Sequence, residues 1–344
     1  PLIQLALLLD TSNSMDGLIN QAKSQLWKIV AETGRLHRES RKPVLQVALY
    51  EYGNDNLSAM SGYIRQVSSF TTDLDYISSC LFGLLTYGGS EYCGQVIRRS
   101  VRDLDWDRNP DTLKLIFIAG NEPFTQGDVN YVRAVNESVD RDILVNTIFC
   151  GDYREGVQTK WKHGADIAGG RYMSINSDYE EVYIQAPQDE RIGELNSLLN
   201  ATYLGYGLQG DSKKEMQEEQ DVNAAHMSQG SLLERARVKA SPSYANSSWD
   251  LVDAYASGEV TPSAVPEEAL PEEMRTMTDR EKDEYVSDLL ARREEIQAEI
   301  LRLSREREDY LEQQTRQNTN VSTLDSALLD AILHAAAVKG FNLE

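Results

Sequence analysis

The sequence predicts a doubly wound α/β fold with a mostly parallel six-stranded sheet, followed by an α-helical C-terminal extension. Up to about residue 180, strand-like runs alternate with helix-like segments, which is the pattern of a parallel α/β sheet. Several of the runs are apolar throughout, as in strands that helices cover on both faces. After that point the composition becomes rich in Glu, Gln and Ala, which favours helices.

Six strands are expected at residues 2–9, 44–52, 63–70, 113–119, 143–150 and 171–175. The run 63–70 alternates polar and apolar residues, so we expect it to be an antiparallel edge strand beside 44–52. Helices are expected at 17–36, 74–85, 95–104, 128–141 and 159–168. In the first helix Leu18, Ala22, Leu26 and Ile29 recur at helical spacing and form one apolar face for the sheet.

The domain boundaries follow from these changes of composition. We expect the α/β domain over 1–183, a helical extension packed on it over 184–257, a proline-containing linker over 258–277, and a long charged helix with a terminal amphipathic helix over 278–344. In the long helix one seam is apolar every seven residues, but the other includes Arg293 and Arg307. A free two-stranded coiled coil needs both seams apolar, so we expect this helix to fold back onto helix 213–239 or the α/β domain.

The charge and composition exclude several classes of function. A net charge of −21 repels nucleic acid and anionic lipid, and favours divalent cations or basic protein patches as partners, unless it serves solubility alone. No run approaches the ~20 apolar residues that a membrane span needs. The histidines and glycine pairs lack the context of a catalytic or nucleotide-binding motif, so we expect no enzyme. Cys80 and Cys93 could form a disulfide, but three free thiols, with Cys150, are favoured.

The candidate site is the segment Asp10-Thr11-Ser12-Asn13-Ser14 between the first strand and the first helix. Open α/β sheets bind ligands at the carboxyl ends of their strands, which is where this segment lies. The Asp10 carboxylate and the Ser12 and Ser14 hydroxyls can converge on a hard cation, which prefers oxygen ligands. In the alternative interpretation, Asp10 and Ser12 only cap the loop and the helix.

The run DTSNSM, with the helix after it, resembles the opening of the metal-ion-dependent adhesion site of the von Willebrand factor A (vWA) family. The resemblance implies a sheet that binds Mg2+, Mn2+ or Ca2+ at its upper edge, and a partner protein whose acidic residue completes the coordination. In YGGSEYCG, Ser90 takes the place of a family Thr ligand and Glu91 adds a carboxylate. Residues 1–180 resemble the family, and the full chain resembles a bacterial subgroup of vWA-containing proteins.

The fourth buried strand departs from the family pattern. Family members end this strand in Thr-Asp-Gly, whereas LIFIAGNEPF has Ala119 and Gly120 at the Thr and Asp places. The site therefore lacks one carboxylate, for which Glu91 or Glu122 could compensate. The resemblance implies a non-enzymatic protein-binding module. The alternatives are a structural or assembly subunit, with possible self-association, and an adaptor of a MoxR-type AAA ATPase. The start at Pro1 and the adhesion-type site favour an exported location, periplasmic or extracellular, over a cytoplasmic one.

Overall fold

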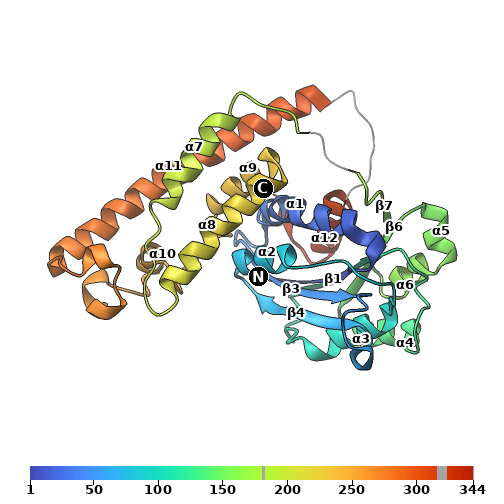
Figure 1. The fold of residues 1–344 in the computed structure, drawn as a ribbon. Helices are drawn as coiled ribbons and strands as arrows, with labels where there is room; N and C mark the ends of the chain where they lie inside the picture. The colour runs from blue at the N-terminus through green and yellow to red at the C-terminus, as the bar shows by residue number, and fades with distance from the viewer. Residues whose placement is uncertain (180–182, 316–323, 344) are drawn as a thin grey trace. The chain divides into compact units, whose positions relative to one another are not determined.

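The computed structural model describes residues 1–179, 183–315 and 324–343 (Figure 1). The chain divides into two compact units, one formed by residues 1–181 and 319–344 and the other by residues 182–318. No helix in the described ranges is both long enough and apolar enough to cross a membrane.

Unit 1 is built on a six-stranded sheet with the strand order β4-β3-β1-β5-β6-β7. All neighbouring strands are parallel except β4, which runs antiparallel to β3 at the edge. This order and the antiparallel edge strand confirm the predicted fold class. The strands are β1 (Leu2–Asp10), β3 (Val44–Tyr52), β4 (Ile64–Thr71), β5 (Leu113–Gly120), β6 (Leu144–Cys150) and β7 (Tyr172–Ile175). A separate small sheet pairs β2 (Leu36–His37) with β8 (Asn342–Leu343).

Helices cover both faces of the sheet because its strands are apolar on both faces. Ala6 and Leu8 of β1 belong to the core that packs against α3, α4 and α6, whereas Leu7 and Leu9 face α1, α2 and α12. The helices of unit 1 are α1 (Asp16–Thr33), α2 (Leu74–Phe82), α3 (Cys93–Asp103), α4 (Tyr131–Val139), α5 (Tyr153–Gln158), α6 (Trp161–Ile167) and α12 (Leu324–Val338).

Helix α12 lies beside α1 on the sheet, although about 290 residues of chain separate them (Figure 1). The side chain of Gln21 accepts a hydrogen bond from the Leu324 main-chain N–H at 3.0 Å, and Lys28 pairs with Asp325 at 2.7 Å. The sequence assigned this amphipathic helix to the C-terminal extension. The structure corrects that assignment, because the apolar face of α12 covers β5, β6 and β7.

Unit 2 is helical and is an insertion between β7 and α12 of unit 1. The predicted helix 213–239 is two helices that meet at Ser228, whose hydroxyl accepts a hydrogen bond from the Ser231 main-chain N–H and caps the second one. The expected linker 258–277 is folded instead: it forms three short 3-10 turns, and Leu270 and Met274 are buried against α10 and α11. The helices are α7 (Asp189–Asn200), α8 (Gly210–Met227), α9 (Gln229–Lys239), α10 (Leu251–Ala256) and α11 (Asp279–Thr315).

The long helix α11 packs against α7, α9 and α10 within unit 2, which agrees with the prediction that it folds back onto the region 213–239. Its seam arginines are buried in ion pairs: Arg293 with Asp250 at 2.6 Å and Arg307 with Asp189 at 2.8 Å. Trp249 is buried and stacks on Tyr203 of the same unit.

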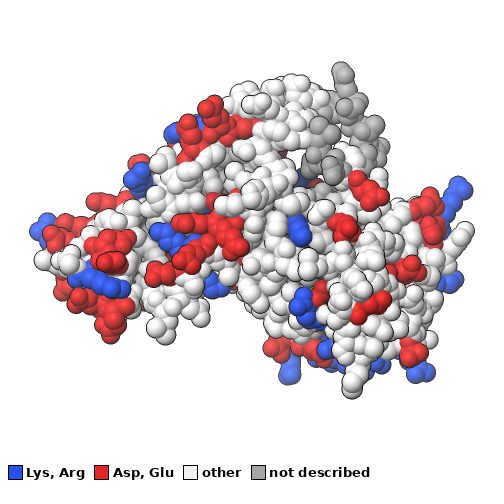
Figure 2. All heavy atoms as spheres, in the orientation of Figure 1, with Lys and Arg blue, Asp and Glu red and all other residues white. Residues whose placement is uncertain are grey.

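The acidic charge of the chain is visible on the surface. In Figure 2, Asp and Glu side chains gather on the visible face of unit 2, and α8 contributes exposed Glu215, Glu218 and Glu219. A surface of this sign attracts cations and basic protein surfaces and repels phosphate backbones.

Candidate functional site

Asp10 is the last residue of β1 and lies at the carboxyl end of the sheet. Its side chain is fully buried, and Oδ1 accepts a hydrogen bond of 2.8 Å from the Ser12 main-chain N–H. Its other oxygen, Oδ2, is buried without a hydrogen-bond partner in the structure. The loop-capping role expected in the alternative interpretation is therefore present, but it accounts for only one of the two carboxylate oxygens.

The two serines that follow lie with their hydroxyls together. Ser12 Oγ is 3.3 Å from Ser14 Oγ, and Asn121 Nδ2 donates to Ser14 Oγ at 3.1 Å. Ser12 is buried, whereas Ser14 is exposed. The Asn121 amide oxygen is buried without a partner. Asn121 was expected in the turn after β5, but no role in the site was predicted for it.

Glu91 lies against Asp10 at the start of the segment that leads into α3. Its main-chain N–H donates to Gln126 Oε1 at 2.7 Å, and the preceding Ser90 forms an isolated β-bridge with Gly53. Gly53 has a φ of +81°, and a Cβ there would lie 2.7 Å from Asp10 Oδ1 and 2.8 Å from Glu91 Cγ. A glycine is thus required twice, by backbone conformation and by the close approach of both acidic side chains.

Burial raises the pKa of both carboxyl groups, to about 6 for Asp10 and to about 10 for Glu91. The Asp10 carboxyl contributes to the increase at Glu91, whereas a side-chain hydrogen bond with Glu91 lowers the pKa of Asp10. The charge of half-buried Glu122 adds a smaller upward contribution to both pKa values. No described Lys, Arg or His forms an ion pair with Asp10 or Glu91.

Gly120 ends β5 at the place where the family pattern has an Asp. A Cβ on Gly120 would lie 2.5 Å from the Tyr52 hydroxyl and 3.0 Å from Asp10 Oδ2. Tyr52 is fully buried, and its hydroxyl donates to the Ala119 carbonyl at 2.9 Å. Tyr52 thus fills the space of the missing side chain. Tyr52 could not be predicted as part of the site, because an apolar strand end gives no signal that its tyrosine reaches across to β5.

These residues fit a hard divalent cation. The structure brings together Asp10, Ser12, Ser14 and Glu91, with Ser90 and Glu122 nearby. It leaves buried oxygens of Asp10 and Asn121 without partners, a state that costs free energy unless a ligand or water satisfies them. In the described part of the chain, no three His, Cys, Asp or Glu side chains gather closely enough to hold an ion. An ion here therefore needs hydroxyl or water oxygens beside the carboxylates.

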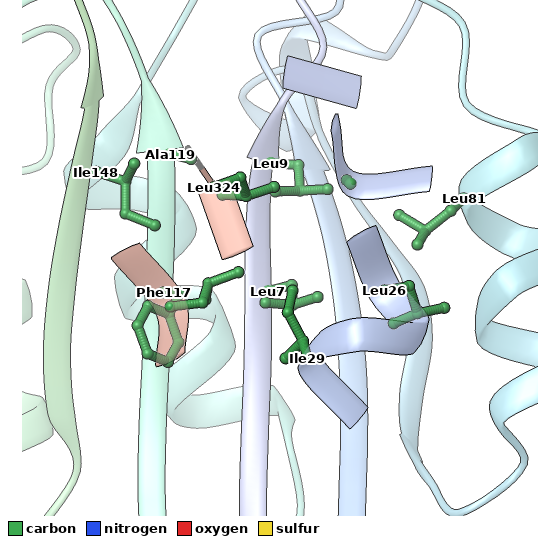
Figure 3. A pocket seen from close by; sticks show the side chains of 11 residues that line it. Leu7, Leu9, Leu26, Ile29, Leu81, Phe117, Ala119, Ile148 and Leu324 are labelled. Atoms are coloured by element: carbon green, nitrogen blue, oxygen red, sulfur yellow. The ribbon is translucent and has the colours of Figure 1, made fainter. Parts of the chain in front are cut away.

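Two hollows flank the site. One lies under α1 and α12, where Leu7, Leu9 and Leu324 point into it, and has a volume of about 10 Å3 (Figure 3). It is apolar and holds at most about one water, so it is a packing defect and no ligand site. The other is an open polar groove of about 530 Å3 at the carboxyl ends of β6 and β7, lined by residues 150–153 and 174–178.

The three cysteines are free, as the sequence favoured. Cys93 and Cys150 are buried, and burial raises the pKa of both thiols, so neither is an activated nucleophile. Cys93 Sγ lies 3.9 Å from the Tyr52 hydroxyl, beneath the site.

No model of a known protein family and no curated protein matches the sequence. Among solved structures, the chain is similar to a von Willebrand factor type A protein from Catenulispora acidiphila (16% identity, TM-score 0.38, 50% of this chain and 38% of that one). It is also similar to the SpRpn10 VWA domain (16% identity, TM-score 0.38, 50% of this chain and 87% of that one). A third similar structure is proximal thread matrix protein 1 of the mussel byssus, with a zinc-occupied MIDAS motif (10% identity, TM-score 0.35, 50% of this chain and 41% of that one).

The match spans less than half the length of the bacterial and mussel chains. At such identities the likeness concerns the fold alone. Unit 1 has the doubly wound, mostly parallel α/β fold predicted from the sequence, with an antiparallel edge strand. The bacterial subgroup and the ligand roles of the site residues stay predictions.

Proposed function

We propose that the chain is a non-enzymatic protein-binding module whose binding surface is the carboxyl edge of the unit 1 sheet. A divalent ion, Mg2+ or Mn2+, lies at this edge and is held by Asp10, Ser12, Ser14 and Ser90. The observation that carries the proposal is the buried Asp10 carboxylate. One of its oxygens has no partner, and two serine hydroxyls lie 3.3 Å apart in the loop that follows.

The arrangement supports binding to a protein partner. Ser14 is exposed while Asp10 and Ser12 are buried, so an ion here is held from below and keeps coordination positions open above. An acidic side chain of the partner takes one of these positions. The polar groove beside β6 and β7 lies along the same sheet edge and offers room for the residues next to it.

Ion binding is expected to stabilise the protein. After treatment with EDTA, addition of millimolar Mg2+ or Mn2+ is expected to raise the thermal midpoint, because a ligand that binds only the folded state adds RT ln(1 + [L]/Kd), or ~2.7 kcal/mol at a hundredfold excess over Kd. Asp10→Ala is expected to abolish that increment, whereas Asp128→Ala, an exposed control, retains it. Differential scanning fluorimetry measures all three; an equal increment in Asp10→Ala contradicts the proposed site.

A further inference from the structure

We propose that Glu91 is the second carboxylate ligand of this ion, and that it replaces the carboxylate missing from the end of β5. The inference rests on the proposed ion site and decides between its two candidate carboxylates, Glu91 and Glu122. It moves the acidic ligand from the turn after β5 to the segment before α3, on the opposite side of Asp10.

The position of the Glu91 side chain beside Asp10 favours it as the ligand. The side chains of Glu91 and Asp10 both pack against the backbone of Gly53, where an added Cβ would collide with both of them. Glu91 is only 3% exposed, and its backbone is held by Gln126 and by the bridge between Ser90 and Gly53. A carboxylate that is buried and held beside Asp10 is prearranged for a shared ligand.

The charge of the buried Asp10 and Glu91 carboxylates also favours an ion between them. Two buried carboxyl groups side by side, with no basic partner among the described residues, are unfavourable unless a proton or a cation lies between them. The free Asp10 Oδ2 adds an unsatisfied acceptor to the same place. One divalent cation neutralises both charges and satisfies that oxygen, and Ser12 and Ser14 supply neutral ligands beside it.

The turn after β5, from which Glu122 would have to reach the ion, is less suited to supply the carboxylate. Gly120 leaves no room there for a side chain, because Tyr52 and Asp10 already occupy the space. The residue of this turn that reaches the serines is Asn121, with a hydrogen bond of 3.1 Å to Ser14. Glu122 is only half-buried, and its carbonyl accepts a hydrogen bond from Trp161 Nε1 at 2.8 Å, so the backbone of Glu122 is tied to α6.

One functional consequence follows. Asp10 and Glu91 together balance the two charges of the ion, so the protein binds the ion before any partner arrives. Ion affinity of the isolated chain then depends on both carboxylates.

The test is Mn2+ binding by the full chain, measured as free Mn2+ by electron paramagnetic resonance after removal of metals with EDTA. Wild type is expected to bind one Mn2+ at this site. Glu91→Gln is expected to weaken binding by about tenfold to a hundredfold or more, since loss of even a supporting group around a metal has that effect. Glu122→Gln is the matched control and is expected to stay within about threefold of wild type, and Asp10→Asn is expected to lose binding.

Folding is monitored separately by the thermal midpoint in EDTA. Glu91→Gln is expected to match or exceed the wild-type midpoint there, because it removes one of two adjacent buried acids. Wild-type affinity in Glu91→Gln overturns the inference, whatever the effect of Glu122→Gln, and leaves the proposed ion site standing. Absence of Mn2+ binding by wild type, or its retention in Asp10→Asn, overturns both.

Discussion

Replacing Arg293 by Met is expected to destabilise unit 2 by about 3–5 kcal/mol, because it breaks a buried ion pair from one side only. Arg293 is 1% exposed, and its guanidinium lies 2.6 Å from Asp250, 2.5 Å from Asp253 and 3.9 Å from the centre of the Tyr203 ring. Methionine keeps much of the volume but leaves Asp250, which is fully buried, without its cation. The aspartate then has to protonate or remain charged in an apolar environment.

The neighbouring Arg292 provides the matched control, since it lies on the exposed side of the same helix. Arg292→Met is expected to change the free energy of unfolding by no more than about 0.5 kcal/mol. Hydrogen exchange measured by mass spectrometry separates the units, and faster exchange in peptides from residues 183–315 is expected only for Arg293→Met. Equal exchange in the two variants would show that the Arg293 ion pair does not hold the unit together.

Gly120→Asp restores the residue of the vWA pattern, but it is expected to destabilise unit 1. The new Cβ meets the Tyr52 hydroxyl at 2.5 Å and Asp10 Oδ2 at 3.0 Å, so the crowding alone costs about 1–3 kcal/mol. A further carboxylate beside Asp10 and Glu91 adds like-charge repulsion. We therefore expect a lower thermal midpoint in EDTA and no gain in Mn2+ affinity.

Two alanine variants separate the causes of this effect. Gly120→Ala carries the crowding without the charge and is expected to lie between wild type and Gly120→Asp. Gly89→Ala tests the same loop region at a position where a Cβ meets no atom within 4 Å, so it is expected to leave the midpoint nearly unchanged. A Gly120→Asp protein as stable as wild type, with tighter Mn2+ binding, would show that Tyr52 does not block this position.

Local patterns were sufficient to predict the sheet and the position of Asp10, Ser12 and Ser14 at its carboxyl edge. Buried parallel strands are continuous apolar runs, so β1, β3, β5 and β6 were each predicted to within one residue at either end. Asp10 ends β1 and Ser12 and Ser14 follow it, so the strand-to-helix turn places all three at the carboxyl edge of the sheet.

The features that could not be predicted from the sequence depend on long-range contacts. Tyr52 of β3 contacts Gly120 of β5 across the intervening strand β1, and α12 reaches α1 only after the whole of unit 2. The arginines of α11 broke the heptad pattern, and the sequence could not show that Asp250 and Asp189 lie opposite them. Periodicity identifies which face of a helix is buried, but it does not identify the partner that satisfies a buried charge.

We propose above that a divalent ion binds at the carboxyl edge of β1. Crystals of the protein grown with MnCl2, measured near the manganese absorption edge, test it most directly through anomalous difference density. We expect one peak at coordination distance from oxygens of Asp10, Ser12, Ser14, Ser90 and Glu91. A map from crystals grown at saturating MnCl2 that has no peak there, or has its only peak at another site, would contradict ion binding at this edge.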